Sequence, residues 1–263
     1  MNAPTSRIAF RSRPLLTLLL ILGAAGAFAE DWKPVLPDRS LFEEGRFVFE
    51  QNCIVCHGQF GDGKGELAAG LTIKPRSFRT GVFKYRSTAA GKMPSNQDLK
   101  RTIRDGITGT AMGMFTNLRQ EELDAVVEYI KGFSRKWKDP ANYAQPVNFP
   151  APPAWFADAA HRKPHEDAGA ALFETLCLPC HGKEGKGDGP AAPALKDDLG
   201  DPAQPANLRD RNYRNGNDPQ DIYRVLTLGI SGTPMVAMEA TLSEEQRWQL
   251  AAFLRRICGA AAE

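Results

Sequence analysis

The sequence has few cysteines and lacks the runs of alternating polar and apolar residues that are typical of strands. Five cysteines in 263 residues are too few for a disulfide scaffold, and the missing alternation argues against a protein built on β-sheets. Hydrophobic residues make up 42% of the chain and charged residues 24%. These ordinary proportions argue against disorder and against several membrane spans.

Residues 1–29 have the layout of a secretory signal peptide. Three arginines precede an apolar run and a small-residue cleavage site: Arg7, Arg11 and Arg13, then residues 15–22, then Ala27-Phe28-Ala29. The apolar stretch is shorter than the roughly 18–20 residues that a membrane span needs. We therefore expect cleavage after Ala29, export to the periplasm, and no stable membrane span in the mature protein.

The positive charge of the chain comes from this first segment. The whole sequence has 33 basic and 31 acidic residues, a net charge of +2, and residues 1–29 contribute three arginines and no acid. The remainder carries −1, divided into +3 for residues 30–150 and −4 for residues 151–263. Because a nucleic-acid-binding protein needs a strongly basic surface, we expect no nucleic-acid partner.

The chain contains two copies of one unit. Five residues of the first copy recur 124 positions later: Gly45, Phe49, Cys53, Cys56 and His57 become Gly169, Phe173, Cys177, Cys180 and His181. Further on, residues 106–112 match residues 229–235, and both segments end in methionine. A repeat of this length identifies a tandem duplication.

A proline-rich stretch separates the copies. It contains five prolines: Pro140, Pro146, Pro150, Pro152 and Pro153. Repeated prolines favour an extended, semi-rigid connector, and Tyr143, Trp155 and Phe156 suggest that it docks on a domain surface. The sequence therefore predicts one domain over residues 30–138, a linker over 139–160, and a second domain over 161–263.

The readable elements within each copy are helices. Apolar periodicity predicts them over residues 41–52, 98–105, 121–133, 167–176, 219–228 and 243–257. Gly106 and Gly229 fit the C-terminal ends of two of these helices, and Ser243 with Gln246 has the pattern of a capping box. The predicted fold class is all-α, with two small domains in tandem.

The chemistry of the sequence lies in two Cys-x-x-Cys-His motifs, residues 53–57 and 177–181. This pattern attaches c-type heme: both thiols add to the porphyrin vinyl groups, and the adjacent histidine binds iron. A zinc site would need a second close ligand pair, and a thioredoxin-like redox pair would need a βαβ context. A disulfide would leave the repeated histidine unexplained. We therefore expect two covalently bound heme c groups, with His57 and His181 as metal ligands.

Methionines at equivalent positions are the candidates for the sixth iron ligand. Met112 and Met235 each follow a Gly-Thr-x sequence, 55 and 54 residues after their histidines. Methionine on the distal side closes the iron for electron transfer. A lone methionine is more often a core filler, but the matched placement favours ligation. Met114 and Met238 are competing candidates, whereas Met93 has no counterpart and is expected to be structural.

Other conspicuous residues have less specific interpretations. The glycine runs 61–65 and 185–189 lack the flanking strand and Gly-Lys-Ser/Thr ending of a phosphate loop, so we expect turning backbone near a heme edge. His161 and His165 are predicted to be solvent-exposed linker residues, and they are the spare imidazoles for a bis-histidine alternative. Cys258 is expected to be a buried, inert thiol in the last helix.

These features resemble class I cytochromes c, and their pairing resembles the diheme cytochromes c of bacterial periplasmic electron transport. The resemblance covers about residues 40–134 and 166–258. It implies that the first and last helices of each domain cross through a glycine and an aromatic residue, which Gly45 with Tyr129 and Gly169 with Phe253 match. It also implies a proline whose carbonyl accepts a hydrogen bond from the proximal histidine. Pro75 and Pro205 are the candidates.

The resulting prediction is a soluble periplasmic diheme cytochrome that transfers single electrons and is not itself an enzyme. Its expected partners are redox proteins: an oxidase, a quinol-oxidising complex or a periplasmic dehydrogenase. Two alternatives remain open. One is a diheme enzyme, such as a peroxidase or a thiosulfate-type dehydrogenase, which would need one unusual distal ligand. The other is a fixed cytochrome subunit of a larger oxidoreductase complex.

Overall fold

The computed structural model describes Met1, residues 33–210 and residues 213–258. The predicted signal peptide therefore lies outside the described residues, apart from Met1. Within the described ranges the protein is helical, and its β pairing is limited to two isolated bridges, Thr88 with Pro146 and Lys196 with Pro202. This confirms the all-α, two-domain prediction. None of the helices in these ranges is long and apolar enough to cross a membrane.

The first copy forms four α-helices: α1 (Phe42–Asn52), α2 (Ile54–His57), α3 (Asn96–Asp105) and α4 (Gln120–Lys131). The second copy repeats this order with α5 (Ala159–Leu176), α6 (Leu178–His181), α7 (Pro219–Leu228) and α8 (Glu244–Ile257). Five of the six predicted helices agree with these bounds to within two residues at each end.

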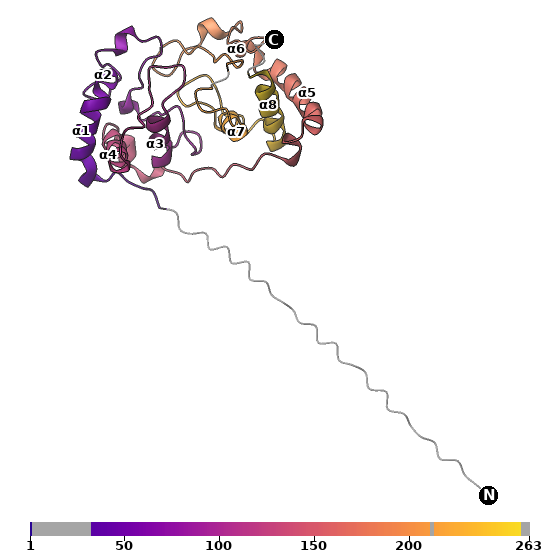
Figure 1. Ribbon diagram of the computed structural model, residues 1–263, viewed down its shortest axis with the longest axis horizontal. Coiled ribbons are helices and arrows are strands. Elements are labelled where there is room, and N and C mark those ends of the chain that lie inside the picture. Colours follow the sequence, from indigo (N-terminus) through magenta and orange to yellow (C-terminus); the bar gives the residue numbers. More distant parts are fainter. Residues whose placement is uncertain (2–32, 211–212, 259–263) are drawn as a thin grey trace. The chain divides into compact units, whose positions relative to one another are not determined.

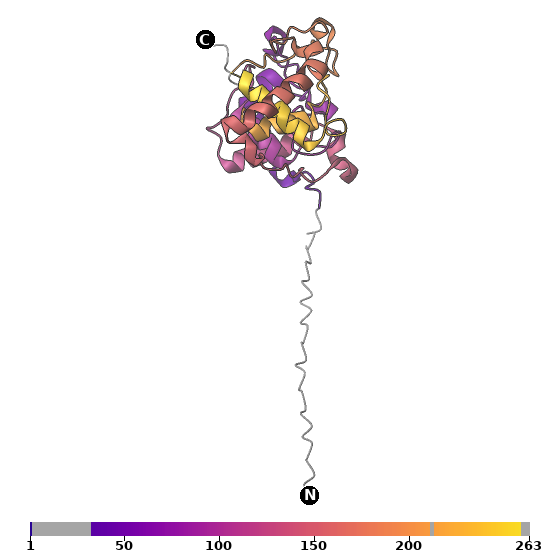
Figure 2. The same ribbon diagram turned by 90° about the vertical axis from the view of Figure 1, so that its right-hand side faces the viewer.

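The first and last helices of each copy pack directly against each other, α1 on α4 (Figure 1) and α5 on α8 (Figures 1 and 2). Glycine makes each crossing close. A Cβ added at Gly45 would collide with the carbonyl oxygen of Ala125 and lie 2.8 Å from the Cβ of Tyr129. In the second copy, a Cβ at Gly169 would collide with the Gln249 carbonyl. The predicted glycine–aromatic crossings are present in both copies.

Local signals fix the ends of the other helices. The Ser95 hydroxyl accepts from the Asp98 backbone N–H, and the Asp98 carboxylate accepts from the Ser95 N–H, which closes a capping box at the start of α3. Ser243 and Gln246 form the predicted box at the start of α8. α3 and α7 end at Gly106 and Gly229, whose φ angles of 65° and 64° favour glycine.

The linker is docked rather than free. The Tyr143 hydroxyl donates to the Trp137 carbonyl at 2.7 Å, and the Val147 N–H donates to the Ser87 carbonyl at 2.7 Å. Phe156 is buried in the second core, where its ring packs edge-on against Trp248. The aromatic residues that suggested docking are therefore the ones that anchor the segment.

The helix predicted over residues 167–176 begins eight residues earlier, at Ala159. The Asp158 carboxylate caps it by accepting from the backbone N–H groups of Ala160 and His161. Pairs four residues apart, Arg162 with Glu166 and Lys163 with Asp167, support the added turns. The helix continues past Pro164, which has no backbone N–H to donate within it.

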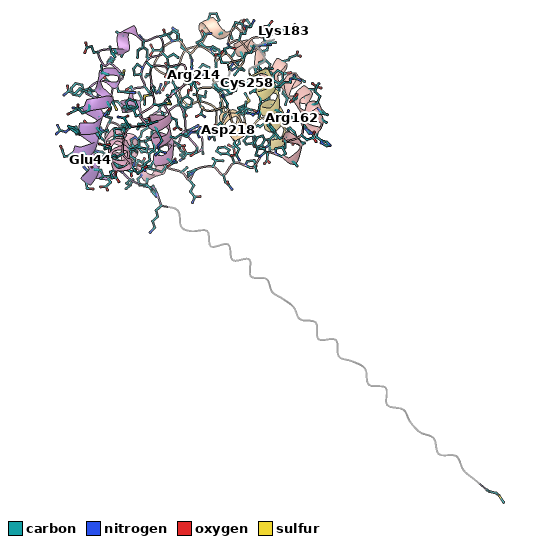
Figure 3. The ribbon with its side chains drawn as sticks, viewed as in Figure 1. Glu44, Arg162, Lys183, Arg214, Asp218 and Cys258 are labelled. Carbon is teal, nitrogen blue, oxygen red and sulfur yellow. The ribbon has the colours of Figure 1, made fainter. Side chains whose placement is uncertain are left out.

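Two other expectations were wrong in detail. His165 lies in α5 rather than in an exposed linker: its ring stacks on Trp155 at 3.8 Å, and its Nδ1 lies 2.9 Å from Glu245. His161 is exposed, as expected, but it belongs to the same helix. Cys258 (labelled in Figure 3) is the residue that caps α8, and its half-buried thiol donates to the Asp210 carbonyl at 3.2 Å.

Candidate heme sites

The first Cys-x-x-Cys-His motif is one helical turn placed immediately after α1. The Cys53 N–H still donates to the Phe49 carbonyl at 2.8 Å, and the His57 N–H donates back to the Cys53 carbonyl at 2.9 Å. This turn brings both thiols and the imidazole to a single cavity, which Cys53, Cys56 and His57 line together. The second motif repeats these hydrogen bonds, with Cys177 bonded to Phe173 and His181 bonded to Cys177.

The imidazole of His57 is held on two sides. Its Nδ1 lies 3.1 Å from the Arg76 carbonyl, and its ring stacks on Phe78 with 4.4 Å between centroids. A proton on Nδ1, donated to that carbonyl, leaves the Nε2 lone pair free for a metal. Burial lowers the pKa of His57, which favours the neutral imidazole that ligates metals.

The same hydrogen bond recurs at His181, whose Nδ1 lies 3.1 Å from the Ala206 carbonyl. Burial also lowers the pKa of this histidine. The expectation that Pro75 and Pro205 supply the acceptors was wrong by one residue in each copy. The carbonyls of both prolines face glycines instead, Gly63 and Gly187 respectively, where a Cβ would collide with them.

The predicted glycine runs are the turns that permit this approach. Gly63 and Gly187 have φ angles of 77° and 78°, which other residues rarely adopt. Gly63 also donates its N–H to the His57 carbonyl, at 2.9 Å, and Gly187 does the same to His181, at 2.8 Å. Each glycine loop therefore joins the histidine turn to the segment that carries its acceptor.

The two methionine loops have the same hydrogen bonds. In the first, the Met112 N–H donates to the Thr110 hydroxyl at 3.0 Å, and the Ile107 N–H donates to the Met112 carbonyl at 2.9 Å. In the second, Met235 bonds to Thr233 at 3.2 Å and to Ile230 at 2.9 Å. The duplication has preserved the geometry of the loop as well as its sequence.

Of the competing methionines, neither matches this placement. Met112 lines the cavity with His57 and both thiols, whereas the Met114 side chain is 71% exposed. Met235 packs on the edge of the second core, while Met238 is a buried member of it. Met93, expected to be structural, is also buried in the first core.

The first cavity fits an apolar macrocycle with a metal at its centre. Apart from its thiols, imidazole and thioether, its walls are mainly hydrophobic and include Leu71, Ile73, Phe83, Leu99, Ile103 and Phe115. Nitrogen and soft sulfur donors suit iron in such an environment. Burial raises the pKa of the Cys53 thiol to about 12 and that of Cys177 to about 11, which keeps these thiols neutral.

Sequence reasoning missed a polar group at the same cavity. Arg76, Lys84 and Tyr85 line it from the first copy, and Arg214 reaches it from the second. A signal for Arg76 was present in the repeat. Arg76 directly follows Pro75 as Ala206 directly follows Pro205, and both residues supply the carbonyl that faces a histidine. No such signal marks Arg214, because it lines the first cavity only where the two copies meet.

Comparison with known proteins supports the duplication. Residues 42–134 match the family model described as cytochrome c, and residues 164–254 match the model described as "Cytochrome C oxidase, cbb3-type, subunit III". Two curated relatives, each named "Cbb3-type cytochrome c oxidase subunit CcoP", come from Azospirillum sp. (strain B510) and Azospirillum brasilense. They are 25% and 24% identical to this chain and cover 82% of it. The chain spans 62% and 61% of their respective lengths.

A solved structure is similar over most of the chain. A chain of the Kuenenia stuttgartiensis reducing HAO-like protein complex Kustc0457/Kustc0458 is 34% identical, with a TM-score of 0.75. The match covers 82% of this chain and 96% of that chain. Two helical domains with Cys-x-x-Cys-His turns define a c-type cytochrome. The protein belongs to this family as a member with two cytochrome c domains, and it binds two covalently attached heme c groups.

Proposed function

We propose that this cytochrome transfers single electrons through two hemes that are each ligated by histidine and methionine. Each heme, when bound, supplies a one-electron Fe(III)/Fe(II) couple. His57 and Met112 hold the first iron, His181 and Met235 hold the second, and the four motif cysteines form the thioethers. The observation that carries the proposal is the identical hydrogen bonding of the two methionine loops.

The protein contributes rigidity to both sites. Nδ1 bonding to the Arg76 and Ala206 carbonyls fixes both imidazoles, so little reorganisation accompanies a change of oxidation state. Methionine ligation raises the reduction potential, which suits a donor to an oxidase or an acceptor from a dehydrogenase. Removal of the proposed ligands one at a time tests the assignment, with the iron–methionine absorption of the oxidised protein as the readout.

We further propose that the mature protein acts in the periplasm as a carrier between redox partners. The Arg-rich, apolar leader and its Ala27-Phe28-Ala29 site support export. Periplasmic extraction of the natively expressed, tagged protein tests this location. Recovery of an uncleaved, heme-free chain from the cytoplasm would contradict it.

A second candidate is a subunit fixed in a larger complex. The names of the relatives favour it: one group is named as an oxidase subunit, and the solved chain belongs to a protein complex. Gentle purification from the native organism, with molar mass measured by light scattering, distinguishes the two roles. A carrier has the mass of one chain with two hemes, whereas a subunit elutes with stoichiometric partners.

An enzymatic role is the less favoured alternative. A peroxidase or dehydrogenase of this type needs one heme with an open or labile distal position, and the matched methionine loops offer no such difference. Catalytic turnover of peroxide or thiosulfate by the purified protein, without a partner, would support an enzyme instead.

A further inference from the structure

Arg76 joins the first heme site to the second copy of the fold. Its guanidinium donates two hydrogen bonds to the Asp198 carboxylate, at 2.6 and 2.5 Å. Its Nε donates to the Val82 carbonyl at 2.8 Å, so the planar group is held on both sides. The side chain is 11% exposed and that of Asp198 is 31% exposed. Bidentate geometry and partial burial make this a specific contact rather than a loose surface pair.

The backbone of the same residue contacts the first proximal ligand. The Arg76 carbonyl is the acceptor for the Nδ1 of His57. One residue therefore holds the imidazole with its main chain and the second copy with its side chain. A change in the strength of the hydrogen bond between His57 and Arg76 would therefore act on a residue whose side chain is held by Asp198.

Asp198, the other residue of this pair, contacts the second methionine loop. The Asp198 N–H donates to the Gly232 carbonyl at 3.0 Å, and Gly232 lies three residues before Met235. A Cβ added at Gly232 would lie 2.7 Å from the Asp198 carboxylate and 2.9 Å from the Arg76 guanidinium. The pair therefore packs against the loop that carries the proposed distal ligand of the second heme.

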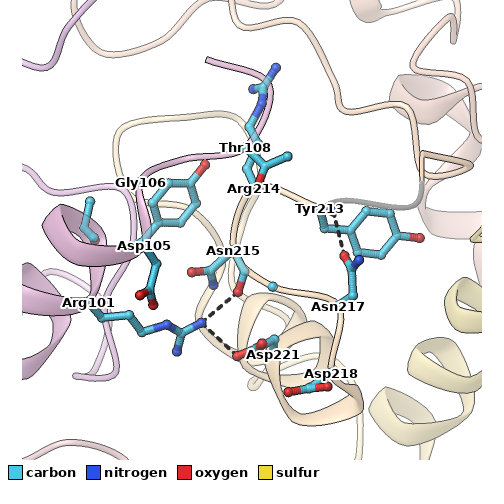
Figure 4. A pocket seen from close by; sticks show the side chains of 13 residues that line it. Arg101, Asp105, Gly106, Thr108, Tyr213, Arg214, Asn215, Asn217, Asp218 and Asp221 are labelled. Carbon is cyan, nitrogen blue, oxygen red and sulfur yellow. Dashed lines mark hydrogen bonds and ion pairs between the residues drawn. The ribbon is translucent and has the colours of Figure 1, made fainter. Parts of the chain in front are cut away.

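Other contacts between the copies are independent of this pair. Arg101 of α3 donates to the Asp221 carboxylate and to the Asn215 carbonyl, each at 2.9 Å (Figure 4). Arg86, which is buried, donates to the Leu228 carbonyl at 3.2 Å. We expect these contacts to remain when Arg76 or Asp198 is changed. Such variants therefore test the coupling between the two heme sites rather than the packing of the two copies.

We propose that Arg76 and Asp198 are positioning residues that couple the two heme sites, so that the oxidation state of one heme shifts the reduction potential of the other. The proposal rests on the function proposed above. The Nδ1–H of His57 would donate more strongly to the Arg76 carbonyl when an iron held at Nε2 is oxidised than when it is reduced. The contacts from Arg76 to Asp198 and from Asp198 to Gly232 would carry this difference to the Met235 loop. Coupling of this kind is reciprocal.

The test is a redox titration of the diheme protein in which each heme is followed separately by its NMR methyl resonances. In the wild type we expect reduction of one heme to change the equilibrium constant for reducing the other by about fivefold. That factor corresponds to about 40 mV at 59 mV per tenfold change. Arg76→Lys keeps the charge but loses the fork, and Asp198→Asn keeps the shape but loses the charge. Each is expected to reduce the coupling below about twofold.

Asp197→Asn is the matched control. Asp197 is the neighbouring carboxylate, which lies 3.8 Å from the Arg76 guanidinium and 3.8 Å from the Lys84 ammonium. It accepts hydrogen bonds from the backbone N–H groups of Leu199 and Asp201. The substitution Asp197→Asn removes the same charge as Asp198→Asn and leaves the Arg76–Asp198 hydrogen bonds in place. We expect it to retain the coupling, and we expect the double variant Arg76→Lys, Asp198→Asn to lose no more than either single variant.

Three results would overturn the proposal: independent titration of the wild-type hemes, unchanged coupling in Arg76→Lys and Asp198→Asn, or an equal loss in Asp197→Asn. The last result would assign the effect to charge alone. The iron–methionine absorption, recorded on the same samples, separates this failure from failure of the proposed function. If that absorption is intact in the wild type and coupling is absent, only the coupling proposal is wrong.

Discussion

His57 stacks on Phe78, with 4.4 Å between ring centroids and 19° between ring planes. Phe78 is 9% exposed and belongs to the first core, where it also contacts Phe49, Phe83 and Phe133. The ring that orients the His57 imidazole is therefore the same ring that fills the core beside it. The position of this imidazole and the stability of the domain depend on one side chain.

Replacing Phe78 with alanine is expected to destabilise the first domain by about 3–5 kcal/mol, because a large buried ring is lost and a cavity remains. Denaturant unfolding of the heme-loaded protein, followed by heme absorption, measures this. Phe60→Ala is the control, since Phe60 is 66% exposed. Equal stability of the two variants would show that Phe78 does not support the site.

The helix crossing gives a second prediction. Gly45→Ala places a methyl group against the Ala125 carbonyl. The backbone of α4 cannot move aside as easily as a flexible side chain can. We expect a loss of about 1–3 kcal/mol in the free energy of unfolding. Gly70→Ala is the matched control, because nothing lies within 4 Å of a Cβ at Gly70. The prediction is contradicted if both substitutions have the same small effect.

The Arg76–Asp198 pair predicts a dependence of stability on acidity. The hydrogen bond from Arg76 is the largest cause that lowers the pKa of Asp198 from its ordinary value of 3.8. A carboxyl whose pKa is lowered by folding stabilises the protein above its unfolded pKa, and this contribution is lost as pH falls through the folded value. Asp198→Asn should therefore be less stable than the wild type near neutral pH. The difference should shrink below pH 3.8.

Denaturant unfolding at a series of pH values checks this dependence. Glu43→Gln provides the comparison, because its carboxylate is 86% exposed and should change stability by no more than about 0.5 kcal/mol at any pH. A wild-type advantage over Asp198→Asn that persists undiminished at pH 2 would mean that the carboxylate charge is not its source.

Much of the fold follows from local sequence. Periodic apolar residues predicted the helices, and Ser243 with Gln246 predicted a capping box. These features depend on residues a few positions apart. The close helix crossings at Gly45 and Gly169 were expected from the resemblance to class I cytochromes c. The start of α5 was misplaced because its first turns are held by the Asp158 cap and the Trp155–His165 stack and lie outside the apolar pattern that predicted the helix.

The sequence offered candidate residues for the site but not their surroundings. Spacing identified the motif cysteines and histidines as candidates, and the repeat identified Met112 and Met235. The acceptors for the histidines lie one residue beyond the predicted prolines, because the proline carbonyls face the glycine loops. The Arg76–Asp198 contact joins residues 122 positions apart. Neither local propensity nor the repeat could reveal such a contact, since it depends on how the two copies pack.

We propose Met112 and Met235 as the distal ligands of two hemes in one chain. The most direct measurement is the absorption of the oxidised protein in the red band that arises from methionine bound to Fe(III). We expect Met112→Ala and Met235→Ala each to remove about half of this band and the double variant to abolish it. Met114→Ala, at an exposed site, should leave the band unchanged. Full intensity in either single variant would contradict the assignment of that methionine.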